Sequence, residues 1–187
     1  RDPSRIVHYE NATYPGAKGK GTDIVSRMYL QAKDLEEIVE FWGGDRPLML
    51  AEYTHAMGNS NGNLDAYWDK IWTNPKIAGV FVWDWMDQGL RQPIPYGIKD
   101  PWGRTEFMAY GGWWEDRVAI FNDNNFCMNG LISADWTPHS GLRALKYIQQ
   151  PAKARLVEGK RPALSIENRY DFSDLADELT LHWSINE

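Results

Sequence analysis

A carboxylate, a phenol and an imidazole occur within four residues, at Glu52, Tyr53 and His55. They follow the apolar run Leu48-Met49-Leu50, and the turn dipeptide Gly58-Asn59 comes soon after them. A short apolar run bounded by turn residues is typical of a buried strand, covered on both faces. Because a carboxylate at the carboxyl end of such a strand can serve in catalysis, we interpret this stretch as a candidate catalytic rim.

The same residues also have a purely structural interpretation, in which Glu52 faces water or pairs with an arginine. Residue type and spacing alone leave the two interpretations open. Other polar groups at the ends of apolar runs, or isolated in the chain, are interpreted as structural, since no second ligand stands at a metal-binding spacing from the histidines. These are Glu10, Asp84, Asp87, His8, His139 and His182.

Aromatic side chains make up 13% of the chain, with ten tryptophans, nine tyrosines and six phenylalanines. Flat rings fill protein cores, and they also stack on the C–H faces of sugars. Trp42, Trp68 and Trp72 lie on helical stripes and are predicted to be core. Trp113 and Trp114 lie in a long loop and could either pack or contact sugar.

Composition narrows the classes of partner. The 187 residues are 43% hydrophobic and 25% charged, which is globular, and the net charge of −6 argues against nucleic acids and anionic membranes. The single cysteine, Cys127, allows no disulfide framework or thiolate cluster within the chain. No apolar run has the length of a membrane span, and the first residues do not resemble a signal peptide, so a cytoplasmic and a periplasmic location are both open.

Residues 1–150 alternate between predicted strands and helices. Strands are expected at 5–10, 23–29, 48–52 and 78–85, and helices at 35–42, 64–72 and, after an N-cap at Thr137-Pro138, at 142–148. Residues 89–130 lack periodicity and are predicted to form a long loop. This order predicts parallel βα units, forming either half of an eight-stranded barrel or a small open sheet.

The period changes at Ala152. Leu164 and Ile166 alternate with polar residues, as do Leu179, Leu181, Trp183 and Ile185, which predicts strands with one buried face. Residues 151–187 are therefore expected to begin a second domain, of the β-sandwich type.

Five stretches together resemble glycoside hydrolase family 2, and within it the large β-galactosidases. They are RMY at 27–29, EYTHAMGNS at 52–60, FVWDWMDQ at 81–88, FCMNGL at 126–131 and DWTPH at 135–139. The resemblance implies an α/β fold in which residues 1–150 form the second half of a TIM (β/α)8 barrel and residues 151–187 the first strands of a β-sandwich.

By this resemblance, the reaction is retaining hydrolysis of terminal β-galactosides such as lactose, in which one carboxylate attacks and a second acts as acid and base. Glu52 would be the nucleophile, Tyr29 the phenol beside it, and His55 a hydrogen-bonding partner of sugar hydroxyls. Trp83 would form an apolar wall for the galactose.

The resemblance also implies cations. The backbone carbonyl of Phe126 and the side chain of Asn129 would bind Na⁺, which contacts a galactose hydroxyl, as hard cations prefer oxygen ligands. The family's Mg²⁺ ligands and its acid/base glutamate lie in a region that would precede Arg1, so we expect the isolated chain to be inactive. The family is often oligomeric, which predicts a homo-oligomer. The alternatives are a non-catalytic carbohydrate-binding module and another family 2 specificity, such as β-glucuronidase.

Overall fold

The computed structural model describes residues 2–13, 20–114, 121–159, 161 and 163–184. It divides into two compact units, Arg1–Leu145 and Lys146–Glu187. The first unit carries all of the predicted site residues.

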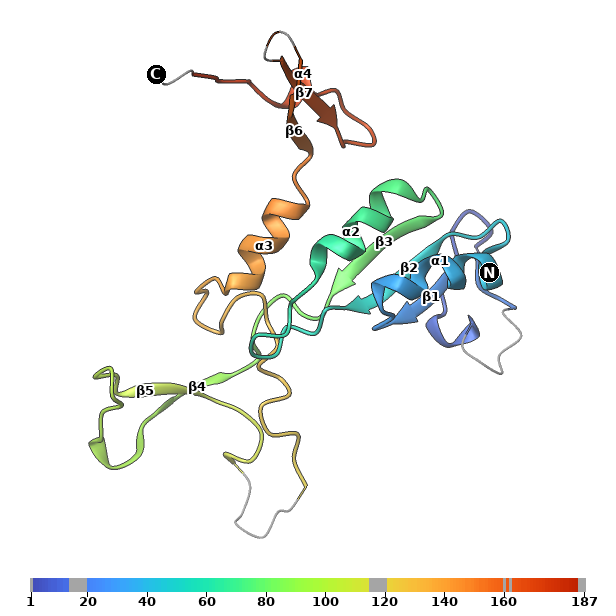
Figure 1. The fold of residues 1–187 in the computed structure, drawn as a ribbon. Helices are drawn as coiled ribbons and strands as arrows, with labels where there is room; N and C mark the ends of the chain where they lie inside the picture. The colour runs from blue at the N-terminus through green and yellow to red at the C-terminus, as the bar shows by residue number, and fades with distance from the viewer. Residues whose placement is uncertain (1, 14–19, 115–120, 160, 162, 185–187) are drawn as a thin grey trace. The chain divides into compact units, whose positions relative to one another are not determined.

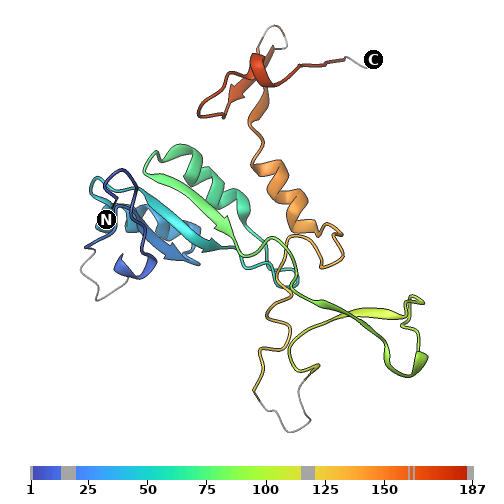
Figure 2. The same cartoon turned by 180° about the vertical axis from the view of Figure 1, so that it is seen from behind.

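A three-stranded parallel sheet forms the centre of the first unit. Its strands are β1 (Val25–Met28), β2 (Leu48–Tyr53) and β3 (Ile77–Val82), hydrogen-bonded in the order β1-β2-β3. Figure 1 shows the three strands side by side, and Figure 2 shows the same sheet from behind. Three of the four predicted strands are thereby confirmed. Compared with the prediction, β1 is shorter at both ends, β2 is one residue longer, and β3 begins one residue earlier and ends three residues earlier.

Helical segments connect these parallel strands. Between β1 and β2 the chain forms a continuous helical stretch, made of η2 (Ala32–Asp34), α1 (Leu35–Ile38) and η3 (Val39–Gly43). Leu35 and Val39 of the predicted stripe are buried, and Gly44 ends the stretch with φ of 52°. Between β2 and β3 lies α2 (Leu64–Thr73), again where the apolar spacing predicts it. The α/β character is confirmed.

An irregularity in β2 decides which residues face the helices. Its partner strand β1 pairs Arg27 with Leu50 and then Met28 with Glu52, so Ala51 is an extra residue. Strict alternation would put Glu52 on the buried face of Leu48 and Leu50. After the extra residue it is Tyr53 that is fully buried together with them, while Glu52 is only half-buried. The bulge therefore turns the carboxylate away from the helices.

The chain beyond β3 has a fourth, shorter neighbour at residues 129–132. Asp84 N donates to Asn129 O (2.7 Å), Leu131 N to Asp84 O (3.0 Å) and Ile132 N to Trp85 O (3.1 Å), with a parallel bridge between Met86 and Ile132. This segment lies next to the extension of β3.

The predicted strand at 5–10 is wrong. Val7 N donates to the Asp23 carboxylate (2.8 Å) and Tyr9 N to the Thr22 hydroxyl (3.3 Å). The Thr22 hydroxyl and Asp23 N donate back to the Val7 carbonyl, at 3.3 Å and 2.8 Å. Because side chains take the hydrogen bonds that a strand partner would supply, no ladder forms, and the segment ends in the short 3₁₀ helix η1 (Glu10–Thr13).

The region predicted as one long loop contains an antiparallel hairpin. Its strands are β4 (Leu90–Pro93) and β5 (Glu106–Ala109), with the one-turn helix η4 (Pro95–Gly97) between them. The strands are four residues each, and β4 has no fully buried residue. Too few apolar residues alternate to give a sequence signal.

The third predicted helix does not begin at Thr137-Pro138. Helix α3 (Ser140–Ile148) starts two residues beyond Pro138. Thr137 and Pro138 are instead held in a turn, since Ser133 N donates to Thr137 O (2.8 Å) and Pro138 forms an antiparallel bridge with Ile132.

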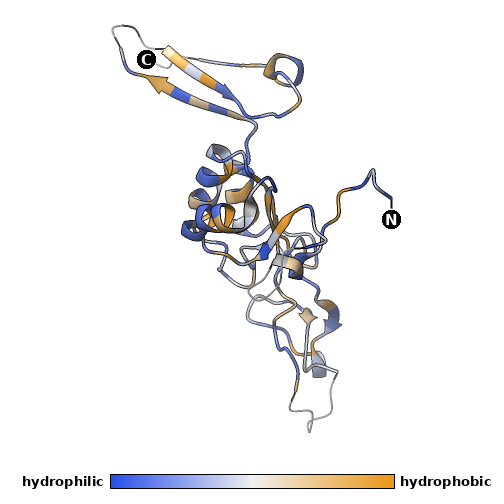
Figure 3. Ribbon diagram, turned by 90° about the vertical axis from the view of Figure 1, so that its right-hand side faces the viewer, coloured by the Kyte–Doolittle hydropathy of each residue, from blue (hydrophilic) through white to orange (hydrophobic). Residues whose placement is uncertain are grey.

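The second unit contains one antiparallel strand pair, β6 (Ala152–Val157) with β7 (Ala163–Asn168), and the short helix α4 (Leu175–Glu178). In Figure 3 hydrophobic and hydrophilic residues alternate along the two strands. Two strands do not make a sandwich. The predicted strand over 179–185 is wrong for its described residues, 179–184. Leu181 is 60% exposed and Trp183 75%, and no neighbouring strand pairs with them in the described part of the unit.

The sheet does not close into a barrel within the described residues: β1 and β3 are its two edges, apart from the short segment beside the β3 extension. In the same part of the chain, no helix has both the length and the apolar character needed to cross a bilayer.

Candidate functional site

The site begins where the parallel strands end. Glu52 lies near the end of β2, and Tyr29 directly follows the neighbouring strand β1. The Tyr29 hydroxyl donates to Glu52 Oε2 at 2.7 Å, and Tyr29 N donates to the Glu52 carbonyl at 2.9 Å. Tyr29 has φ of 52° and Thr54 of 48°, values that are uncommon for residues with bulky or branched side chains. Strained backbone of this kind often marks functional sites.

The surroundings keep the Tyr29 phenol protonated. Burial, followed by the hydrogen bond to Glu52 and the negative charges of Glu52 and Asp84, raises the pKa of Tyr29 well above its ordinary value. A protonated phenol donates a hydrogen bond to a carboxylate and so stabilises its ionised form. The Tyr29 hydroxyl therefore gives Glu52 one oriented donor.

The phenol that lies beside Glu52 is Tyr29, and not Tyr53, which follows Glu52 directly in the sequence. Tyr53 is fully buried, accepts a hydrogen bond from Trp68 Nε1 (3.1 Å) and lies edge-on to Tyr67 of α2, with ring centroids 5.4 Å apart. Burial raises the pKa of Tyr53. The bulge in β2 explains the change, because it puts Tyr53 on the helix-covered face.

His55 and Phe126 continue the row of rings that starts at Tyr29. The ring centroids of Tyr29 and His55 are 6.1 Å apart in an edge-on arrangement, and those of His55 and Phe126 are 5.1 Å apart. Buried His55 Nε2 has no hydrogen-bond partner within the described residues. The structure thus brings four of the predicted residues together.

Trp83 is connected to this group through its backbone. Trp83 N donates to Tyr53 O (3.1 Å), and Ala56 N donates to Trp83 O (2.8 Å), which ties the end of β3 to the loop that carries His55. The Trp83–Asp84 peptide bond is cis. The side chain is half-buried, and its Nε1 has no partner in the described ranges.

Asn129 is buried beside the same strand end. It is 1% exposed, its carbonyl accepts from Asp84 N at 2.7 Å, and its Oδ1 has no donor among the residues that the structure describes. An orphaned amide oxygen fits a hard cation or a ligand hydroxyl. The histidine, cysteine and carboxylate side chains of the described residues form no group of three that could hold a metal.

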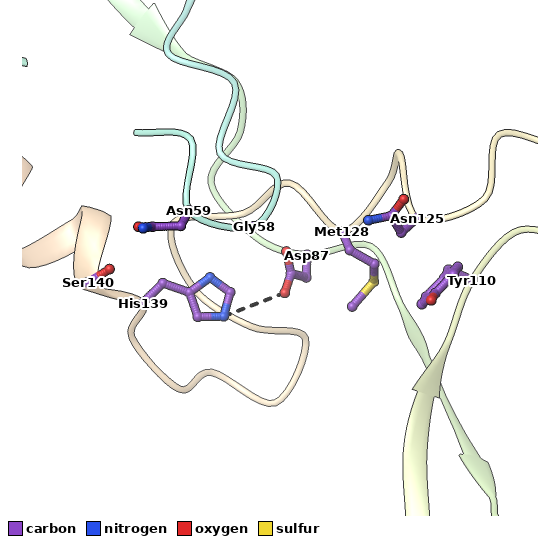
Figure 4. A pocket seen from close by; sticks show the side chains of 8 residues that line it. All are labelled: Gly58, Asn59, Asp87, Tyr110, Asn125, Met128, His139 and Ser140. Carbon is purple, nitrogen blue, oxygen red and sulfur yellow. Dashed lines mark ion pairs between the residues drawn. The ribbon is translucent and has the colours of Figure 1, made fainter. Parts of the chain in front are cut away.

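Two residues interpreted as structural from the sequence belong to this end of the sheet. Asp87 Oδ1 accepts from Gly130 N (2.7 Å), and His139 Nε2 lies 3.7 Å from Asp87 Oδ2. They line an open pocket with Asn59, Asn125 and Ser140, and Figure 4 shows the His139 ring pointing toward Asp87. In the sequence, both residues lie in stretches that carry the family resemblance, Asp87 in 81–88 and His139 in 135–139. Their contact could not be predicted, because it depends on segments 84–87 and 129–132 lying side by side.

A family model, "Glycosyl hydrolases family 2, TIM barrel domain", matches residues 1–154. The chain belongs to glycosyl hydrolase family 2. Curated family relatives named "Beta-galactosidase" are similar over the whole chain: 38% identity with the protein of Actinobacillus pleuropneumoniae, 40% with that of Photobacterium profundum and 39% with that of Alteromonas mediterranea. The family 2 chain spans only 17–18% of the length of these relatives.

Proposed function

We propose that the chain is part of a longer β-galactosidase that hydrolyses terminal β-D-galactosides with retention. Residues 1–150 would form the second half of its barrel, and residues 151–187 the start of a β-sandwich domain. The family match and the names of the relatives support the class of reaction. The roles of individual residues rest on the geometry around Glu52.

The observation that carries the proposal is the hydrogen bond between Tyr29 and Glu52 at the carboxyl end of parallel strands. Catalytic groups of (β/α)8 enzymes lie at this end of the sheet. A glycan-stacking module needs rings but no oriented carboxylate. The paired phenol and carboxylate therefore favour an enzyme over a non-catalytic binding module.

In the first step, a Glu52 oxygen attacks the anomeric carbon as the glycosidic C–O bond breaks. The leaving oxygen takes a proton from a second carboxylic acid, which we place elsewhere in the longer protein. In the second step, water attacks the glycosyl ester and gives its proton to that second carboxylate. The C–O bond to Glu52 breaks, and Glu52 leaves as a carboxylate.

Tyr29 would act on Glu52 in both steps. Its hydroxyl is bonded to Oε2, which orients the other oxygen for attack and stabilises the negative charge that returns to Glu52 when the ester breaks. The raised pKa of Tyr29 keeps the proton on the phenol.

His55 and Trp83 would bind the sugar. The unpartnered His55 Nε2 can hydrogen-bond a galactose hydroxyl, and the ring contact with Phe126 holds the imidazole in place. The half-buried Trp83 indole offers an apolar face to the C–H groups of the sugar.

The cation assignments are also proposals. Asn129 Oδ1 and the Phe126 carbonyl are oxygen donors that would hold Na⁺, and the orphaned state of Asn129 Oδ1 fits that role. Bound Na⁺ would supply a ligand site for a galactose hydroxyl. We expect the Mg²⁺ ligands outside this chain, and we expect the longer protein to be a homo-oligomer.

The test is mechanism-based labelling of the full-length protein with a 2-deoxy-2-fluorogalactosyl donor that carries a good leaving group. The trapped ester should map to the peptide that contains Glu52, and Glu52→Gln should abolish labelling. Label on another residue, with normal turnover, would sink the nucleophile assignment. Galactoside binding without any turnover would support the carbohydrate-binding module instead.

Specificity within the family is tested in the same preparation. Nitrophenyl β-galactoside and nitrophenyl β-glucuronide are compared by kcat/KM. We expect preference for the galactoside, whereas a higher value for the glucuronide would identify a β-glucuronidase.

A further inference from the structure

Gly130 lies where no side chain fits. A Cβ atom on this residue would lie 2.1 Å from Asp87 N, 2.3 Å from the Met86 carbonyl carbon and 2.4 Å from Ile132 O. All three are backbone atoms, which cannot rotate away. The segment that carries Asn129 is therefore packed directly against the backbone of 86–87.

Side chains hold both polar groups of Gly130. Its N–H donates to Asp87 Oδ1 at 2.7 Å, in a buried bond. Its carbonyl lies 2.9 Å from His139 Nδ1. Since a carbonyl can only accept, Nδ1 must carry the hydrogen.

His139 itself is fixed by its backbone and by Asp87. His139 N donates to Leu131 O at 3.0 Å, and His139 Nε2 lies 3.7 Å from Asp87 Oδ2. Asp87 is 6% exposed, and its backbone N–H donates to Ile132 O at 2.9 Å. Asp87 and His139 thus contact the Gly130 peptide groups from two segments, the β3 extension and the residue before α3. Figure 4 shows the two side chains facing each other.

We propose that Asp87 and His139 are positioning residues for Asn129, and we call the pair the Gly130 clamp. The clamp fixes the peptide groups on either side of Gly130, and this orients the Asn129 carboxamide, whose buried Oδ1 has no donor within the described residues. The inference rests on the proposed function, in which Asn129 binds Na⁺ beside the galactose. Neither clamp residue touches the substrate.

The experiment compares full-length Asp87→Ala, Asp87→Asn, His139→Ala and His139→Asn. Sodium binding is followed by ²³Na NMR line broadening in choline chloride, and KM and kcat are measured at graded sodium. Loss of a residue that supports a metal ligand weakens metal affinity by about 10–100-fold. We expect that loss in Asp87→Ala and His139→Ala, with KM raised and kcat changed by less than about 3-fold.

The conservative variants separate positioning from simple structural loss. Asn at 87 keeps an oxygen that accepts from Gly130 N, and Asn at 139 keeps an amide donor near the place of Nδ1. We expect each to restore most of the sodium affinity. The matched control is Asp100→Ala, because Asp100 also accepts from backbone N–H groups, of Trp102 (2.9 Å) and Arg104 (2.8 Å), but in the β4–β5 hairpin. It should bind sodium like wild type.

Wild-type sodium affinity and KM in folded Asp87→Ala and His139→Ala would overturn the inference. If an alanine variant does not fold, the decision passes to Asp87→Leu and His139→Phe, which keep side-chain volume but remove the contacts to Gly130. A sodium affinity lower than that of Asp100→Ala supports the clamp, and wild-type affinity in both variants overturns it. A wild type without a bound-sodium signal overturns the inference together with the cation assignment. A wild type that binds sodium but does not hydrolyse galactosides overturns the proposed function alone.

Discussion

The Tyr29 hydroxyl and the Glu52 carboxylate are joined by a 2.7 Å hydrogen bond, although 23 positions separate them in the sequence. Two features make this contact possible. The parallel pairing of β1 and β2 puts both strand ends at the same edge, and the bulge at Ala51 turns Glu52 away from the helix-covered face. The backbone hydrogen bond from Tyr29 N to Glu52 O, at 2.9 Å, fixes the register of the two strand ends.

Removing the phenol hydroxyl should slow the reaction without unfolding the site. A hydrogen bond to a charged group contributes about 1.5–3 kcal/mol, so Tyr29→Phe in the full-length protein should lower kcat by roughly 10–100-fold. A steady-state assay with an activated galactoside measures the effect. Tyr147→Phe is the matched control, since Tyr147 is 74% exposed on α3, and its kcat should equal that of wild type. Equal rates in Tyr29→Phe and wild type would contradict the assigned role.

The titration of Tyr29 should depend on Glu52. Burial and the Glu52 carboxylate raise the pKa of the Tyr29 phenol above its ordinary value of about 10. Because the folded pKa lies above the unfolded one, this linkage stabilises the fold fully below about pH 10, and the stabilisation is lost as the pH rises through the folded pKa.

The measurement uses 3-fluorotyrosine placed at position 29 and followed by ¹⁹F NMR, since fluorine brings the phenol titration to lower pH. The midpoint should fall when Glu52→Gln removes the negative charge and replaces the ionic acceptor. Burial raises the pKa of Tyr53, and no carboxylate contributes to that shift. A 3-fluorotyrosine at position 53 should therefore titrate alike with and without Glu52→Gln. An unchanged midpoint at position 29 would show that Glu52 does not act on the phenol.

The parallel sheet could be predicted from sequence because its strands and helices have strong apolar signals. Leu48 and Leu50 are fully buried, and Leu35 and Val39 lie on the helical stripe that the spacing predicts. The short and exposed elements could not be predicted in this way. The hairpin β4–β5 is held by cross-strand bonds between mostly exposed residues, and the segment 5–10 gives its hydrogen bonds to Thr22 and Asp23.

Residue spacing draws attention to Glu52 but not to the phenol that lies beside it. Within the opening stretch, Tyr53 was the nearer candidate, and only the bulge at Ala51 puts it in the core. Tyr29 entered through the family resemblance. Asp87 and His139 are 52 positions apart in the sequence. Their contact depends on the isolated bridge between Met86 and Ile132, which is too short to be predicted as a strand.

A methyl group at Gly130 should be poorly tolerated. The added Cβ would lie 2.1 Å from Asp87 N, so the two backbones would have to separate. Overpacking of this kind costs about 1–3 kcal/mol, and we expect Gly130→Ala to lower the melting temperature of the full-length protein and to reduce kcat/KM by at least about 10-fold. Gly62→Ala is the control, because a Cβ there meets no atom within 4 Å and the residue has no positive φ. Similar melting temperatures for the two variants would contradict the close approach.

The ring contact between His55 and Phe126 should contribute to substrate binding. Their centroids are 5.1 Å apart, and an aromatic pair contributes about 0.5–1.5 kcal/mol beyond its buried area. Phe126→Leu keeps the backbone carbonyl and an apolar side chain but removes the ring. We therefore expect KM for a galactoside to rise by about 2–10-fold, with sodium affinity retained. Phe172→Leu, at a fully exposed ring of the second unit, should leave KM unchanged. If Phe126→Leu loses sodium binding while KM stays at the wild-type value, the ring orders the cation site and does not support His55.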